Sequence, residues 1–224
     1  MITLYALAQS RSIRIVWLLE LLGVEYELKQ YQRQGIFAPD EMKKIHPLGK
    51  APILQDGDLI LTESGAIVDY LISTYGQSQY GRSREQQDYW QYQRWLHYAE
   101  GSLMPFMIMA LVFYKVEHSK MPFFVKPIAR QISQKTYQQF LNPQMRLHLS
   151  MINQELSDKT WLMGDDLTGA DIMMSFALLG AKIRYNLSAY PHILRYLQQI
   201  ERDSAYQRAI QKAGEPMLNM KQTT

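Results

Sequence analysis

The sequence predicts an α/β domain at the N-terminal end and an all-α domain after it. Up to about residue 75, β-rich segments alternate with helical patterns. A polar stretch with two glycines, residues 76–81, then interrupts the pattern. Beyond it only helical periodicity remains, which is typical of helices packed on helices. We therefore expect one domain over residues 1–77 and a second over residues 84–224.

The first domain is expected to contain a βαβ unit, a hairpin and a closing helix. Glycines at 23 and 76 stop the two longer helices, and an Asp-Gly pair at 56 and 57 predicts the hairpin turn. The expected elements are strands at 2–7, 24–28, 52–54 and 59–61 and helices at 11–22, 39–45 and 64–75. This order is that of a thioredoxin-like domain.

Long helical stretches are expected in the second domain, at residues 85–116, 124–156, 170–185 and 192–213. The most apolar segment, residues 103–113, would be about 16 Å long, roughly half the thickness of a bilayer core. We therefore expect it to be a buried or pocket-lining helix and expect no membrane contact. Since residues 1–7 carry neither a basic lead nor a cleavage site, we also expect a cytoplasmic protein.

Composition favours a globular protein and limits its chemistry. The chain has 224 residues, 47% of them hydrophobic, which is enough to fill a core. Its 24 basic and 21 acidic residues are spread without a Lys/Arg run, so no nucleic-acid partner is expected. The sequence contains no cysteine, which excludes zinc-thiolate sites and a cysteine nucleophile. Any thiol chemistry must therefore use a thiol from outside.

The turn after the first strand carries Ser10 and Ser12 directly before a buried helix. In dithiol oxidoreductases of this architecture the same turn holds a Cys-x-x-Cys pair, so serine here excludes dithiol exchange. A serine hydroxyl can still donate a hydrogen bond to a sulfur anion. Its ordinary role at this position is to cap the helix, and both interpretations stay open.

Pro52 opens a strand that the alternation places inside the sheet. Proline cannot donate to a strand ladder, so it either lies at an edge or follows a cis peptide bond. In the cis case the N–H and C=O groups of Ala51 would face a ligand. An ordinary trans proline at an edge is the alternative.

Glu63 and Ser64 begin the helix after the hairpin, where free N–H groups and the positive end of the helix dipole attract carboxylates. Glu63 could accept from an ammonium group while Ser64 receives a carboxylate, as at the amino-acid end of a γ-glutamyl group. Helix capping is the alternative. For Thr168 and Asp171 the capping-box spacing favours a structural role.

Met and aromatic residues recur between positions 104 and 114 and form a soft apolar stretch suited to varied ligands. We consider Met107 and Tyr114 as residues of a substrate pocket, with core packing as the alternative for both. His97 and His118 lie nearby without a carboxylate partner or ligand spacing, so no metal site is expected.

Four segments together resemble the cytosolic glutathione transferase family over essentially the whole chain: residues 5–14, 46–52, 61–64 and 165–171. The spacing of Ser10 and Arg14 is similar to the serine-type theta and delta classes, and the Ser-Arg-Ser run to a fungal and bacterial branch. The family more often has Val or Ile where this chain has Ala51. Theta-like members also carry basic residues around position 37, for which Arg33, Lys43 and Lys44 are loose candidates here.

The resemblance implies a site for glutathione as co-substrate. In it Ser10 activates the thiol, Ala51 and Pro52 form a cis-proline contact, Glu63 and Ser64 hold the γ-glutamyl end, and Lys50 neutralises the glycyl carboxylate. Ser12 joins these as a binding residue. Tyr5, which other classes would use as a catalytic tyrosine, has the wrong offset from Arg14 for that role.

The resemblance further implies a two-fold homodimer that transfers glutathione to a small hydrophobic electrophile without a metal. Peroxide reduction or isomerisation on the same scaffold is the enzymatic alternative. A non-catalytic binding protein is the alternative from another class, since a fold does not fix a function.

Overall fold

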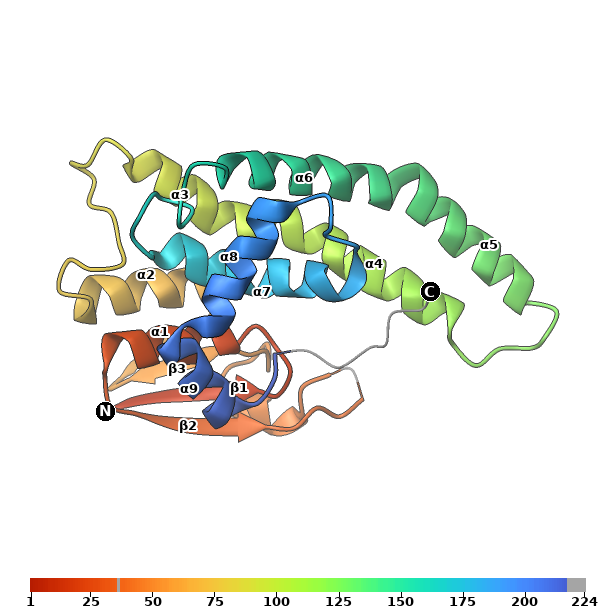
Figure 1. Ribbon diagram of the computed structural model, residues 1–224. Coiled ribbons are helices and arrows are strands. Elements are labelled where there is room, and N and C mark those ends of the chain that lie inside the picture. Colours follow the sequence, from red (N-terminus) through yellow and green to blue (C-terminus); the bar gives the residue numbers. More distant parts are fainter. Residues whose placement is uncertain (36, 217–224) are drawn as a thin grey trace.

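The computed structural model describes residues 1–35 and 37–216, and it confirms an α/β domain followed by a helical domain (Figure 1). The elements of the first domain are β1 (Ile2–Leu7), α1 (Ile13–Leu22), β2 (Tyr26–Tyr31), the 3₁₀ helix η1 (Asp40–Lys44), β3 (Ile53–Asp56), β4 (Leu59–Leu61) and α2 (Ser64–Tyr75). This is the predicted thioredoxin-like order.

The four strands form one mixed sheet in the order β2-β1-β3-β4. β1 runs parallel to β2 and antiparallel to β3, and β3 and β4 form the predicted hairpin, with Gly57 at φ 58° in its turn. Alternate side chains face opposite sides of the sheet. Leu4 and Leu54 join the main core beneath α1 and α2, while Leu7 and Ile53 form a smaller cluster with Met42 of η1.

α1 begins two residues later than the apolar pattern predicted. Residues 10–12 instead form tight turns, in which the N–H of Ile13 donates to the carbonyl of Ser10 and the N–H of Arg14 to that of Arg11. These turns keep both serines outside the regular helix.

The second domain consists of helices that pack over α1 and α2 (Figure 1). They are α3 (Tyr89–Tyr98), the π-helical turn η2 (Ala99–Leu103), α4 (Met104–Glu117), α5 (Lys126–Thr136), the π-helical turn η3 (Tyr137–Leu141), α6 (Asn142–Glu155), α7 (Gly169–Arg184), α8 (Pro191–Arg202) and α9 (Ser204–Ala213). The predicted stretches at 85–116 and 124–156 correspond to α3–α4 and α5–α6, each continuous through its π turn.

The prediction of a single helix over residues 192–213 is wrong, because Asp203 interrupts the helix between α8 and α9. Asp203 adopts an extended conformation, and its side chain accepts from the N–H of Tyr206 at 2.7 Å, which caps α9. The same carboxylate accepts from the indole Nε1 of Trp17 at 2.8 Å. The break therefore ties the end of the chain to α1.

α7 is the central helix of the molecule, and its start is the predicted capping box. The carboxylate of Asp171 accepts from the backbone N–H of Thr168 at 2.8 Å and from its hydroxyl at 3.0 Å. It also accepts from the N–H of Leu162 at 2.9 Å and from the hydroxyl of Tyr196 at 3.1 Å. Both Asp171 and Thr168 are fully buried, which supports the structural role that the spacing predicted.

The apolar segment 103–113 is not a short helix, so the argument from its length is wrong. It belongs to a helix that runs from Tyr89 to Glu117, 29 residues, and is by length and composition able to cross a membrane. A third of its most apolar window is buried inside the molecule. Trp95, Leu103 and Met107 lie in the main core, so one side of this helix packs inside the bundle.

Candidate functional site

The residues predicted to bind a ligand meet at one edge of the sheet. Tyr5, near the end of β1, pairs with Ile53, the first residue of β3. Leu54 of β3 pairs with Leu61, the last residue of β4, so the ends of β1 and β4 and the start of β3 lie at the same end of the sheet. Because neighbouring strands lie about 4.8 Å apart, the turn after β1, the start of β3 and the start of α2 are neighbours.

Ser10 is buried in a small hydroxyl network at the mouth of α1. Its Oγ donates to the carbonyl of Leu7 at 2.7 Å and lies 2.9 Å from the Oγ of Ser12, and it accepts from the N–H of Ser12 at 3.1 Å. The Oγ of Ser12 in turn accepts from the N–H of Leu7 at 3.3 Å. The side chain of Ser12 does not cap α1. The two hydroxyls are hydrogen-bonded to each other and stabilise the turn. The proton that Ser10 donates to the carbonyl of Leu7 can be redirected to a ligand.

The peptide bond between Ala51 and Pro52 is cis, as one of the two alternatives predicted. Pro52 is buried and precedes the first residue of β3, whereas Ala51 is half-buried at the edge of the sheet. Lys50, next to them, is exposed.

The start of α2 has two unusual features. Glu63 has φ 69° and ψ 117°, a conformation that is uncommon for a residue other than glycine and of a kind that clusters at active sites and ligand clamps. Ser64 is 3% exposed, and its hydroxyl has no hydrogen-bond partner among the described residues. Neither side chain caps the helix. The capping interpretation therefore explains neither residue, and a bound carboxylate would satisfy the Ser64 hydroxyl.

Arg33 supports the serine turn from outside. Its Nε donates to the carbonyl of Ala8 at 3.1 Å and its Nη2 to that of Gln9 at 3.0 Å. The sequence presented Arg33 only as a loose candidate for ligand binding, together with Lys43 and Lys44. Lys43 is paired with Asp40 at 2.6 Å in η1.

A partly buried ion cluster joins the serine turn to the helical domain, and sequence reasoning missed it. Glu100 in η2 pairs with the guanidinium groups of Arg11 and Arg14. Arg14 is fully buried, its Nε and Nη2 have no partner among the described residues, and it lies over the ring of Phe176 at 5.4 Å. Burial lowers the pKa of Arg14, and the charge of Glu100 opposes this. The one signal in the sequence was a cation on an otherwise apolar helix.

The side chain of Tyr5 makes its contacts away from the Ser10 turn. Its hydroxyl donates to the side chain of Gln55 at 2.8 Å on the neighbouring strand, and its ring packs against the small cluster around Met42. This arrangement agrees with a packing role.

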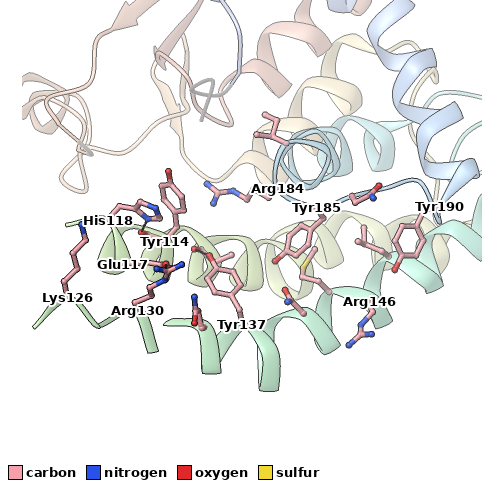
Figure 2. A pocket seen from close by; sticks show the side chains of 17 residues that line it. Tyr114, Glu117, His118, Lys126, Arg130, Tyr137, Arg146, Arg184, Tyr185 and Tyr190 are labelled. Atoms are coloured by element: carbon pink, nitrogen blue, oxygen red, sulfur yellow. Dashed lines mark hydrogen bonds and ion pairs between the residues drawn. The ribbon is translucent and has the colours of Figure 1, made fainter. Parts of the chain in front are cut away.

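A cavity of about 1090 Å³ lies in the helical domain between α4, α5, α6 and the end of α7 (Figure 2). Tyr114 is among its lining residues. Met107 is not, because it is 6% exposed and belongs to the core. His118 also lines the cavity, stacked on Tyr114 with ring centroids 4.2 Å apart, whereas His97 is exposed elsewhere on α3. Ser10, Ala51 and Ser64 are not among the residues that line it.

Groups of three or more His, Asp or Glu side chains that could hold a metal ion do not occur within residues 1–35 and 37–216. The polar groups at this end of the sheet are hydroxyls and backbone amides, which can donate hydrogen bonds, and the carboxylate of Glu63, which accepts them.

Comparison with known families gives two matches. Residues 1–73 match the N-terminal domain of glutathione S-transferases, and residues 103–203 match the C-terminal domain of the same family.

Individual relatives agree over nearly the full length. The chain is 35% identical to glutathione S-transferase 1 of Saccharomyces cerevisiae over 95% of both chains. It is 34% identical to glutathione S-transferase 3 of Schizosaccharomyces pombe, over 98% of this chain and 91% of that one. A crystal structure of a glutathione S-transferase from Actinobacillus pleuropneumoniae is 41% identical and superposes with a TM-score of 0.79, covering 95% of this chain and 93% of that one.

Proposed function

The chain belongs to the glutathione S-transferase family, and we propose that it is a transferase in which Ser10 activates the thiol of bound glutathione for attack on a hydrophobic electrophile. The observation that carries the proposal is the meeting of the Ser10 turn, the Ala51–Pro52 bond and the start of α2 at one edge of the sheet.

The tripeptide would lie along this edge. The backbone of Ala51 offers strand-like hydrogen bonds to the cysteinyl part, and Pro52 supports that backbone. The hydroxyl of Ser64 and the first turn of α2 suit the α-carboxylate of the γ-glutamyl group, while Glu63 suits its ammonium. Lys50 is exposed, where its ammonium group would pair with the glycyl carboxylate, and Ser12 keeps the Ser10 hydroxyl in place.

Activation requires a modest free energy. A free thiol has a pKa near 8.5, and lowering it by about two units corresponds to about 2.7 kcal/mol. A hydrogen bond to a charged group supplies about 1.5–3 kcal/mol. Ser10 would turn its proton from the carbonyl of Leu7 to the sulfur, whose own proton leaves to solvent. The thiolate then forms a C–S bond with the electrophile, whose leaving group departs with the bonding electrons.

Ser10→Ala tests this role. We expect the pKa of the bound thiol to rise by about one to two units and kcat/KM at neutral pH to fall by roughly tenfold to a hundredfold, with glutathione still bound. Ultraviolet absorbance of the thiolate, titrated with pH, gives the pKa directly. Ser157→Ala, in an exposed turn after α6, is the matched control. A thiol pKa that does not change in Ser10→Ala would remove Ser10 from the mechanism.

Assays of turnover with different substrates identify the reaction that the protein catalyses. Capture on glutathione-agarose followed by assays with chlorodinitrobenzene and with a hydroperoxide separates transfer from peroxide reduction. Binding without turnover of either would instead favour a non-catalytic binding protein.

We also propose a two-fold homodimer in the cytoplasm. Ile108, Val112 and Val116 follow one face of α4 at helical spacing and are 40–50% exposed, and Ile128 and Ile132 on α5 are 58% and 52% exposed. Contiguous exposed apolar side chains of this kind are typical of an interface, and two-fold pairing is the commonest arrangement. Analytical ultracentrifugation measures the assembly.

A further inference from the structure

The connection between α4 and α5 protrudes from the molecule and carries two exposed phenylalanines. Figure 1 shows this connection reaching beyond the sheet and beyond α7, α8 and α9. Phe123 and Phe124 lie in it, 86% and 65% exposed, with ring centroids 5.6 Å apart. We call residues 118–126 the α4–α5 tip. Adjacent apolar rings in water cost free energy, so such a pair at a protruding point is typical of a binding surface.

The backbone of the tip keeps both rings exposed. The N–H of Val125 donates to the carbonyl of Pro122 at 3.0 Å, which closes a turn around the two phenylalanines. On the other side of the tip, just after the end of α4, the Oγ of Ser119 donates to the carbonyl of Val116 at 2.9 Å. Proline fixes its own φ and stiffens the turn further. The position of the rings is therefore set by a hydrogen-bonded turn.

The helical hairpin that carries the tip is strongly basic. Residues 101–154 contain six Lys or Arg residues and a single carboxylate, Glu117, which leaves 18 basic and 20 acidic residues for the rest of the chain. Glu117 pairs with Arg130 at 3.6 Å. Lys115, Lys120 and Lys126 are exposed and have no ion pair in the described part of the chain. The small net charge of the whole protein thus conceals a local excess of cations around the two phenylalanines.

Cations that flank exposed apolar rings fit an anionic lipid surface. Ammonium groups pair with headgroup phosphates, while the rings enter the boundary between headgroups and acyl chains. A second copy of the chain fits the tip less well, because two tips related by a two-fold axis would bring like charges together. The apolar residues assigned above to the homodimer interface lie along α4 and α5, outside the tip.

We propose that the α4–α5 tip binds membranes that contain anionic phospholipids, with Phe123 and Phe124 inserted and Lys120 and Lys126 at the phosphates. The protein lies on the bilayer and does not cross it. The absence of membrane contact that we expected from the sequence rested on the length of residues 103–113, which concerns only crossing. This surface contact goes beyond the proposed transferase activity, because it uses none of the residues assigned to glutathione.

Vesicles of two compositions test the charge requirement. We expect the protein to co-sediment at low salt with vesicles of phosphatidylglycerol and phosphatidylcholine, and to bind them at least about tenfold more tightly than vesicles of phosphatidylcholine alone. Salt at about 0.5 M should remove most of this preference, because it screens the lysines from the phosphates. Equal binding to both vesicles, or no binding to the anionic ones, would overturn the proposal.

A double variant tests the rings. Phe123→Ser with Phe124→Ser is expected to weaken binding to the anionic vesicles by about tenfold or more, because the inserted apolar area is lost. Trp90→Ser is the matched control, since Trp90 is an aromatic residue at the start of α3 that is 75% exposed. It should bind as tightly as the unchanged protein. Undiminished binding without the two rings would contradict their insertion.

A second double variant tests the flanking charges. Lys120→Gln with Lys126→Gln should also weaken binding to the anionic vesicles by about tenfold or more, since each lysine near such a surface contributes roughly fivefold. Arg84→Gln with Arg202→Gln removes the same charge at exposed sites outside the hairpin and should change binding by less than about twofold. Equal losses in the two pairs would show that net charge, and not the tip, attracts the protein.

An introduced thiol reports whether the tip enters the bilayer. The chain has no cysteine, so Phe123→Cys offers a single site for a polarity-sensitive fluorophore. We expect its emission to rise and shift to shorter wavelength when anionic vesicles are added, and the emission of the same label on Trp90→Cys to stay unchanged. A label at position 123 that remains in water while the protein binds vesicles would place the contact on another surface.

Analytical ultracentrifugation of the Phe123→Ser, Phe124→Ser protein tests the competing occupant, a second copy of the chain. We expect the same assembly as in the unchanged protein, and a lost dimer would assign the tip to a subunit interface instead. Circular dichroism confirms that each variant is folded. Because no arm uses glutathione, these outcomes are independent of the Ser10→Ala experiment.

Discussion

Ser64 and Arg14 are buried polar residues with side-chain atoms that have no partner among the described residues. The position of Ser64 was predictable, since a helix start after a hairpin has a local pattern. The role of Arg14 was not, because its partner Glu100 lies 86 residues away along the chain. A single cation on an apolar helix indicates a buried charge but not what neutralises it.

Ser64→Ala separates stability from binding. Removing a buried hydroxyl without a partner should leave the free energy of unfolding unchanged or raise it by up to about 1 kcal/mol. The same change should weaken glutathione binding by roughly tenfold or more, because a hydrogen bond to its carboxylate is lost. Urea denaturation and calorimetry measure the two quantities.

Ser73→Ala, on the exposed side of the same helix, is the control for helix propensity. If Ser64→Ala binds glutathione as tightly as the unchanged protein, its hydroxyl does not contact the ligand.

At the scale of elements, local signals predicted the ends of helices well. Gly23 takes φ 64° after α1, and Gly76 ends α2. The division between α8 and α9 was missed because Asp203 owes its conformation partly to Trp17, a contact between distant parts of the chain. The serine turn itself was predicted, but the start of α1 was placed at residue 11 and not at Ile13, because Arg33 and Ser12 hold the backbone of the turn.

Asp171→Asn tests the capping box of α7. The amide has one acceptor oxygen where the carboxylate has two, so some of the four donors around Asp171 lose their acceptor in a fully buried site. We expect the free energy of unfolding to fall by at least about 2 kcal/mol. Asp166→Asn, exposed in the preceding loop, should change it by less than about 0.5 kcal/mol. Equal effects in urea denaturation would show that the box contributes little.

For the whole molecule, the sequence predicted both domains and their order but not how they are joined. The main core is continuous from β1 to α9, and α1 contacts both α7 and α9. Periodicity identifies the apolar face of each helix, but it cannot say which distant helix covers that face. The candidate site residues of the first domain rest on local spacing and stay a prediction, whereas Met107 in the helical domain lies in the core and not in the cavity lining.

Glu100→Gln tests the ionic link between the domains. It leaves the fully buried Arg14 without a counter-charge, so we expect the free energy of unfolding to fall by on the order of 3 kcal/mol. Glu155 is a close control, because it also pairs with two cations and its side chain is similarly exposed, 30% against 26%. Its cations, Arg94 and Lys159, are partly exposed, so Glu155→Gln should cost less than about 1 kcal/mol. If both variants lose a similar free energy of unfolding, the ion pairs of Glu100 do not link the domains more strongly than an exposed pair would.

The contact of Asp203 and Tyr206 with Trp17 has a consequence for synthesis of the chain. Trp17 is fully buried, and the ring of Tyr206 lies 5.3 Å from it. The indole is synthesised 186 residues before the carboxylate of Asp203 to which it donates. The N-terminal domain therefore cannot complete its own interior during translation, and the nascent chain must keep α1 protected until α9 arrives.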